Sequence, residues 1–125
     1  MSYKIFVINT GSTSTKLALF EGWQETWSAD VTHQAAELKK YPALLDQLPY
    51  RRAAIDAALQ KDGVDLTGLI AVAARGGTFG FAKGGAYLVE ENLMEACRNP
   101  ITNHPSNLSA LLAHDIAAQH GCKAF

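Results

Sequence analysis

The segment with the clearest chemical potential is the octet at residues 9–16, NTGSTSTK, near the start of the chain. Its glycine lets the backbone approach a ligand closely, its short hydroxyl side chains offer hydrogen-bond donors without bulk, and its lysine adds positive charge. These properties together suit a polyphosphate. An ordinary hairpin loop is also rich in Gly, Ser and Thr, and the octet alone leaves both interpretations open.

A P-loop is the obvious alternative for a phosphate-binding segment. It requires the pattern GxxxxGK[ST] with a helix directly after it. No second glycine precedes Lys16, and the short apolar run over 16–20 is typical of a strand. We therefore reject the P-loop.

Two residues outside the octet could bind an anionic substrate. Arg75 lies at the end of a predicted strand beside two glycines, where its guanidinium could hold a carboxylate or an acyl phosphate by two parallel hydrogen bonds. A surface ion pair is its alternative role. His104 precedes the last predicted helix, where free backbone amides and the helix dipole favour an anion and a neutral imidazole. A structural hydrogen bond is the alternative for His104.

The elements that must position these residues follow a mixed α/β pattern. Two or three helical pieces are predicted between residues 34 and 61, with Pro49 in a first helical turn and Gly63 just beyond the end. A strand over 69–74 then implies a crossover connection. Before the helices, segments rich in apolar, β-branched and aromatic residues predict three consecutive antiparallel strands, over residues 3–9, 16–20 and 23–31.

The second half of the chain continues this pattern. Half of the ten glycines lie between residues 76 and 85, which predicts a loop after the strand. Helices are predicted over 90–98 and from Ser106, which can cap the second of them, to Gly121, which closes it. The apolar residues 122–125 then resemble a strand cut short, so we expect the chain to be the front of a longer protein.

Composition narrows the functional classes. With 125 residues, 48% of them apolar and 18% charged, the chain is expected to form one packed domain. A net charge of −1 without a basic cluster argues against nucleic acid and membrane partners, and the absence of a long apolar run or a signal pattern predicts a cytoplasmic protein.

Cys97 and Cys122 are expected as reduced, buried thiols. Trp23 and Trp27 are expected on one face of a strand. Surface or cap roles are expected for three histidines, His33, His114 and His120.

The octet resembles the adenosine-phosphate loop NxGSxSxK of the acetate and butyrate kinase family, within the actin, Hsp70 and sugar-kinase superfamily. Every fixed position of that pattern is present. The string GSTSTK, with ARGG at 74–77 and HPSNL at 104–108, is more similar to the butyrate kinases of the family than to its acetate kinases. Acetate kinases carry a substrate-binding arginine where this chain has Val72, so the resemblance does not favour acetate.

The resemblance implies an actin-like, ribonuclease H-like N-terminal domain over residues 1–125, with the second domain outside this chain. It also implies ATP or ADP and Mg²⁺ as cofactors. Asn9 would lie at the magnesium and phosphate end of the site and meet the metal directly or through water. The implied phosphate and nucleotide residues are Asn9, Gly11, Ser12, Ser14 and Lys16, and the implied substrate residues are Arg75 and His104.

The family reaction is ATP plus a short-chain carboxylate, here butyrate, giving ADP and an acyl phosphate, reversibly. The complete enzyme would be a homo-oligomer. The 125 residues alone are expected to be inactive, because the family's catalytic acidic residue, its transition-state histidine and a further arginine come from later sequence. Two alternatives stay open: a noncatalytic actin- or Hsp70-like nucleotide-binding module, and an acetate or propionate kinase.

Overall fold

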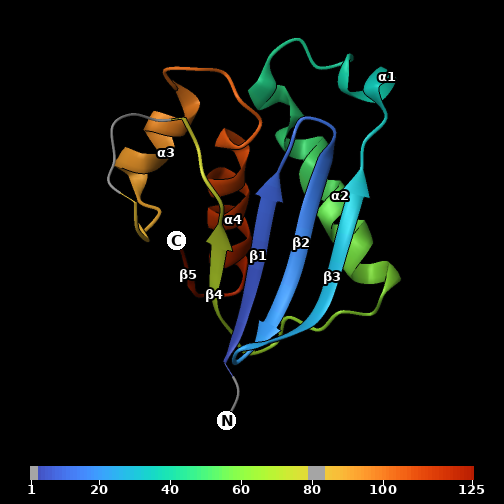
Figure 1. The fold of residues 1–125 in the computed structure, drawn as a ribbon, viewed down its shortest axis with the longest axis vertical. Coiled ribbons are helices and arrows are strands. Elements are labelled where there is room, and N and C mark those ends of the chain that lie inside the picture. Colours follow the sequence, from blue (N-terminus) through green and yellow to red (C-terminus); the bar gives the residue numbers. More distant parts are fainter. Residues whose placement is uncertain (1–2, 79–83) are drawn as a thin grey trace.

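The fold is built on a five-stranded mixed sheet with the strand order β3-β2-β1-β4-β5 (Figure 1). The computed structural model describes residues 3–78 and 84–125. β2 is antiparallel to both β1 and β3, whereas β4 is parallel to β1 and β5. The three-stranded antiparallel start and the crossover strand are therefore confirmed. The strands are β1 (Lys4–Thr10), β2 (Ser14–Glu21), β3 (Gln24–Thr32), β4 (Leu69–Ala74) and β5 (Lys123–Ala124).

Short helical pieces and two longer helices connect the strands. As predicted, the segment before β4 is divided into several pieces, and Pro49 lies in the first turn of the longest one. Gly63 and Gly121 follow the two longer helices with φ of 61° and 68°, a conformation that a glycine adopts without strain. The helical elements are α1 (Ala35–Leu38), a 3₁₀ turn (Leu44–Gln47), α2 (Leu48–Lys61), α3 (Glu91–Arg98) and α4 (Asn107–Gln119).

The core lies between the sheet and the helices α2 and α4, which cover the same face of the sheet (Figure 1). Alternation along β1 and β2 sends one set of side chains into this core, including Phe6, Ile8 and Leu17. The intervening side chains, including Asn9 and Lys16, belong to the opposite face of the sheet. The same alternation that fills the core thus keeps two predicted site residues out of it.

The two tryptophans do not share a face of a strand, so that expectation is wrong. Trp23 lies in the turn between β2 and β3 and is fully exposed. Trp27 lies within β3, stacks on Phe6 with ring centroids 6.4 Å apart and donates a hydrogen bond to Asp62 at 2.9 Å. The turn lies one residue further along the chain than the sequence pattern indicates, so β3 begins at Gln24 and Trp23 falls outside the strand.

Three further expectations concern the cysteines, the glycine-rich loop and the membrane. Cys97 is buried, Cys122 is only half-buried, and burial raises the pKa of both free thiols. The middle of the predicted glycine-rich loop, residues 79–83, lies outside the described residues. Across the described parts of the chain, no helix combines the length and the apolar character that a membrane crossing requires.

Candidate functional site

An open cleft of about 440 Å³ lies where β1 and β4 end and α4 begins. The carboxyl ends of adjacent parallel strands are the usual place for a ligand in an open α/β sheet, because the loops that leave them diverge. The octet forms the β1–β2 hairpin turn, as predicted, and borders this cleft. Ser12, which is exposed in the turn, is not among the lining residues. The other six predicted residues all line the cleft: Asn9, Gly11, Ser14, Lys16, Arg75 and His104.

The electrostatic character of the cleft favours an anion. Its described lining includes two cationic side chains, Lys16 and Arg75, and no carboxylate. Lys16 lies directly across the β1–β2 ladder from Asn9. Neither cation forms an ion pair with any carboxylate of the described residues, so the surface ion pair considered for Arg75 is absent there. Both cations are therefore available to a ligand.

The turn before α4 holds His104 in one orientation. Its Nδ1 accepts the backbone N–H of Ser106 at 3.1 Å and lies 2.8 Å from the hydroxyl oxygen of the same serine. A ring nitrogen that accepts an N–H carries no proton, so the neutral imidazole carries its proton on Nε2. Nε2 has no hydrogen-bond partner in the described part of the chain, which leaves it free to donate to a ligand.

The start of α4 differs from the sequence expectation in two respects. The backbone N–H groups of residues 107, 108 and 109 already donate to the carbonyls of residues 104, 105 and 106, at 2.9, 3.0 and 3.3 Å. The hydroxyl of Ser106 contacts the His104 ring and makes no capping bond. Free backbone amides and a serine cap were therefore wrong expectations, because a tight turn precedes the helix and uses those donors.

The underside of the octet turn rests on Arg51, a fully buried arginine of α2. Its guanidinium donates to the carbonyl of Gly11 at 2.8 Å and to the carbonyl of Ser14 at 2.9 Å, with a longer contact of 3.4 Å to the carbonyl of Ser12. Its Nε donates to Gln47 at 3.0 Å. Burial lowers the pKa of Arg51, but a guanidinium stays charged at any physiological pH.

A chain of buried polar side chains continues from Arg51. Arg51 donates to the hydroxyl oxygen of Thr15 at 3.2 Å, and that oxygen lies 2.8 Å from Nε2 of His33. The Thr15 proton has no other acceptor among the described residues, which assigns Nε2 as an acceptor and the ring proton to Nδ1, 3.3 Å from the hydroxyl of Tyr50. His33 is buried, not a surface residue as expected, and burial together with Arg51 lowers its pKa.

A second network fixes the other end of the turn. Thr10, the last residue of β1, donates its backbone N–H to the hydroxyl of Ser109 at 3.0 Å. Its own hydroxyl donates to the carbonyl of Pro105 at 2.6 Å and lies 2.7 Å from the same serine hydroxyl. Because Pro105 adjoins His104, this network ties the octet to the turn that carries the histidine.

Asn107 holds the segment after Arg75 in place by hydrogen bonds to Thr78. Its buried side-chain oxygen accepts the backbone N–H of Thr78 at 2.5 Å, and its amide nitrogen donates to the hydroxyl of Thr78 at 3.1 Å and to the carbonyl of Thr102 at 2.9 Å. Hydrogen bonds thus hold Thr78, the residue directly after the motif ARGG, to Asn107 of the motif HPSNL, 29 residues along the chain.

Sequence reasoning missed three residues that support the site from behind, Arg51, His33 and Asn107. It also missed Thr10, which lines the cleft. One signal could have identified Arg51: it lies one helical turn before the core residue Ile55, on the apolar side of α2. Charged residues are almost never fully buried without partners, so this position required a polar network opposite it. The hydrogen bonds across the sheet could not be read from the sequence.

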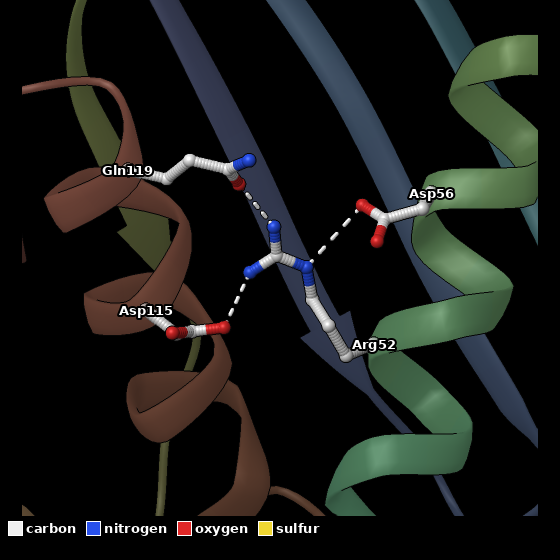
Figure 2. A network of polar contacts seen from close by, with 4 residues as sticks. All are labelled: Arg52, Asp56, Asp115 and Gln119. Atoms are coloured by element: carbon white, nitrogen blue, oxygen red, sulfur yellow. Dashed lines mark hydrogen bonds and ion pairs between the residues drawn. The ribbon is translucent and has the colours of Figure 1, made fainter.

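The next residue along α2, Arg52, points toward α4 (Figure 2). It pairs with Asp115 at 2.5 Å, donates to Gln119, and pairs with Asp56 of its own helix at 3.3 Å. This bridge joins α2, which contains Arg51, to α4, which begins directly after the turn of His104. It therefore contributes to the spacing of the elements around the cleft without touching the cleft itself.

Comparison with known proteins gives a consistent result along the whole chain. The chain is 38% identical over 125 residues to a probable butyrate kinase of Thermotoga petrophila, and 39% identical over 126 residues to a probable butyrate kinase of Coprothermobacter proteolyticus. A probable butyrate kinase of Clostridium botulinum is 33% identical over 126 residues. These matches cover 98–100% of this chain but only 35–36% of each relative. No family model matches the chain.

Proposed function

We propose, on the premise that this chain is related along its whole length to the N-terminal third of the proteins named probable butyrate kinase, that the protein is a short-chain carboxylate kinase. Its reaction would be ATP plus butyrate giving ADP and butyryl phosphate, reversibly. One observation carries the proposal. Three motifs far apart in the sequence, the octet, ARGG and HPSNL, meet on one cleft whose described lining holds two cations and no carboxylate.

The chemistry needs positioning more than reactive side chains. A carboxylate is already deprotonated near neutral pH, so its oxygen attacks the γ-phosphorus without a general base. The new bond joins that oxygen to phosphorus, and the bond from phosphorus to the β,γ-bridging oxygen breaks. Alignment of the two reactants and neutralisation of the phosphoryl charge then supply the rate enhancement.

Each cleft residue has a role in this scheme. Lys16 and the backbone of residues 11–14, with the hydroxyls of Ser12 and Ser14, bind the phosphates of the nucleotide. Arg75 holds the carboxylate with two parallel hydrogen bonds. The Nε2 proton of His104 donates to an oxygen of the substrate. The described lining of the cleft contains no Ser-His-Asp or Cys-His arrangement, which is consistent with direct transfer.

Mg²⁺ is part of the proposal, and the described residues fit it in one way. The carboxamide of Asn9 lines the cleft, has no hydrogen-bond partner among the described residues and offers a hard oxygen ligand, directly or through water. Because no carboxylate lines the described cleft, the nucleotide phosphates would be the main ligands. Bound Mg²⁺ would neutralise part of the charge on the transferring phosphoryl group.

We assign residues 1–125 to an actin-like, ribonuclease H-like domain, which the antiparallel start and parallel continuation of the sheet support. The chain spans about 35% of the length of the relatives, and we assign the second domain to the part of the enzyme that corresponds to the rest. A second domain over the cleft would exclude water and complete the clamp on the phosphoryl group. We also propose that the complete enzyme is a cytoplasmic homo-oligomer.

The test of the function is trapping of the acyl phosphate as a hydroxamate. The intact gene product is incubated with ATP, Mg²⁺, hydroxylamine and, in separate reactions, butyrate, propionate or acetate. We expect butyryl hydroxamate to form fastest. Absence of hydroxamate from all three carboxylates would overturn the proposal, and ADP binding without any hydroxamate would favour a noncatalytic nucleotide-binding module instead.

The domain assignment has its own test in the same assay. The 125-residue chain alone is expected to form no acyl phosphate, because one wall of a cleft cannot exclude water or surround the transferring group. Turnover within an order of magnitude of the intact protein would contradict the assignment of a second domain to the active site.

A further inference from the structure

The carbonyl groups of the octet turn are all used inside the protein. Of the four carbonyls of residues 11–14, Arg51 donates to three, at 2.8, 2.9 and 3.4 Å. The backbone N–H of His33 donates to the fourth, that of Thr13, at 2.7 Å. Every acceptor of the turn is therefore turned toward the protein, and none is left to repel an anion from outside.

The donors of the same turn are arranged in the opposite way. In a trans peptide the C=O of one residue and the N–H of the next point in opposite directions, and the described residues contain no cis peptide. Since the carbonyl of Gly11 points to Arg51, the N–H of Ser12 points away from it. The longer contact to the carbonyl of Ser12 orients the N–H of Thr13 in the same sense, though less strictly. Neither N–H has an acceptor among the described residues.

Arg51 also brings a charge that no described carboxylate neutralises. Its partners are carbonyls, the hydroxyl of Thr15 and the amide oxygen of Gln47. A buried cation without a counter-ion is costly unless its hydrogen bonds are complete, and it raises the potential around the backbone that it supports. An anion on the outer side of the turn, which borders the cleft through Gly11 and Ser14, would supply the missing opposite charge.

We propose that Arg51 is a positioning residue for phosphate: it holds the turn with the N–H groups of Ser12 and Thr13 outward and places a positive charge behind them, so that these amides bind the phosphates of a nucleotide. The proposal rests on the nucleotide part of the proposed function. Arg51 itself does not touch the ligand, because the turn lies between it and the outer surface. Its effect is transmitted through the two peptide planes.

A matched pair of variants tests the proposal in the intact gene product. Arg51→Lys keeps the charge but cannot supply the guanidinium fork that spans the carbonyls of Gly11 and Ser14. Arg52→Lys, one residue along the same helix, changes the α2–α4 bridge and leaves the turn intact. The affinity for ADP is measured by calorimetry and the midpoint of urea unfolding is measured for both variants.

We expect Arg51→Lys to raise the Kd for ADP about tenfold and Arg52→Lys to change it less than about twofold, as loss of well-placed phosphate donors predicts. The KM for the carboxylate is expected to stay within about twofold in both variants, since only phosphate contacts are displaced. A Kd for ADP in Arg51→Lys equal to that in Arg52→Lys would overturn the positioning role.

A second measurement needs no variant and so does not depend on folding of Arg51→Lys. Selective ¹⁵N labelling of serine and threonine makes the amides of Ser12 and Thr13 observable by NMR in the unmodified protein. We expect both resonances to shift on addition of ADP, and the Ser12 amide to shift more, because its peptide is held more strictly. Unchanged Ser12 and Thr13 resonances at saturating ADP would overturn the proposal.

Failure of this inference and failure of the proposed function have different signatures. A protein that binds ADP through the two amides but forms no acyl phosphate would keep the positioning role of Arg51 and contradict the carboxylate kinase. A protein that forms acyl phosphate while the resonances of the two amides are unshifted by ADP would support the carboxylate kinase and contradict the positioning role of Arg51.

Discussion

The two sides of the octet turn are built in opposite ways. On the underside, Arg51, Thr15 and His33 are buried, and each polar group has a protein partner. On the cleft side, Lys16 and Arg75 are exposed, and neither has an ion-pair partner among the described residues. The same turn thus separates a region of completed hydrogen bonds from a region of charges without protein partners.

This difference indicates that the underside mainly stabilises the turn, whereas the cleft side is available to bind a ligand. Buried polar groups stabilise a fold only while each of them keeps its partner, so the underside is sensitive to any loss. Exposed cations without partners contribute little to folding and can be used fully by a ligand. Substitutions on the underside should therefore change the free energy of unfolding, and substitutions on the cleft side should change binding and catalysis alone.

The largest expected effect is that of Arg51→Ala on stability. The substitution leaves the carbonyl of Gly11 without its donor and removes one donor each from the carbonyl of Ser14 and the hydroxyl of Thr15. An unsatisfied buried group costs about 1–3 kcal/mol. We expect the free energy of unfolding in urea to fall by about 3 kcal/mol. Arg52→Ala, which removes a more exposed bridge, should cost about 0.5 kcal/mol in the same measurement.

Equal losses in the two arginine variants would break the comparison, because they would mean that the buried and the exposed guanidinium support the fold alike.

On the cleft side, the largest effect is expected for Arg75→Lys. An ammonium cannot reproduce two parallel hydrogen bonds to a carboxylate, so kcat/KM for butyrate should fall roughly thirtyfold, or about 2 kcal/mol. The free energy of unfolding should stay within about 0.5 kcal/mol of the unmodified value, as for other exposed positions. Steady-state kinetics with butyrate varied at saturating ATP provides the measurement. Unaltered butyrate kinetics would return Arg75 to a surface role.

Lys16→Ala should have a smaller effect, confined to the nucleotide. Loss of one charged contact to phosphate should lower kcat/KM for ATP about tenfold, with a smaller change for butyrate. Varying each substrate separately at a saturating level of the other distinguishes the two. If the ATP dependence were unchanged, Lys16 would be a solvated strand lysine and the cleft side would have one ligand-binding cation fewer.

The smallest effect concerns the pH dependence of stability through His33. Burial and Arg51 hold the pKa of His33 below its usual 6.5, so the unfolded state takes up a proton at a higher pH than the folded state. The contribution of His33 to the free energy of unfolding is therefore complete above about pH 6.5 and declines as the pH falls toward the pKa of the folded state.

Urea unfolding of His33→Gln at pH 7.5 and pH 5.5 checks this. The unmodified protein should lose more stability than the variant between these two values, because the variant has no imidazole to protonate. An equal loss would show that the buried histidine is not penalised for protonation beside Arg51.

The helices and strands of the fold could largely be predicted from the sequence. The three antiparallel strands, the interrupted helical region, the strand over Leu69–Ala74 and the final helix all follow from local signals: alternation of apolar residues, helical spacing, and the positions of proline and glycine. The same signals located the octet in a hairpin turn. At Trp23, the turn extends one residue further than predicted, because the pattern was too short to place the boundary of the strand.

The candidate site was accessible only in part. Residue types and motif strings selected Asn9, Lys16, Arg75 and His104, and the structure brings them to one cleft. The burial and the hydrogen-bond partners of the neighbouring groups could not be predicted from the sequence. The amides at the start of α4, expected to be free, are used by the preceding turn, and His33, expected at the surface, is buried.

By itself, then, the sequence determined which residues have the chemistry for phosphate and carboxylate, because that depends on side-chain type and local order. Only the tertiary structure decided what lies behind them. Arg51 and Arg52 are identical and adjacent, yet successive residues of a helix project about 100° apart. One guanidinium consequently lies beneath the octet turn and the other bridges two helices, and that choice depends on which element packs against each side of α2.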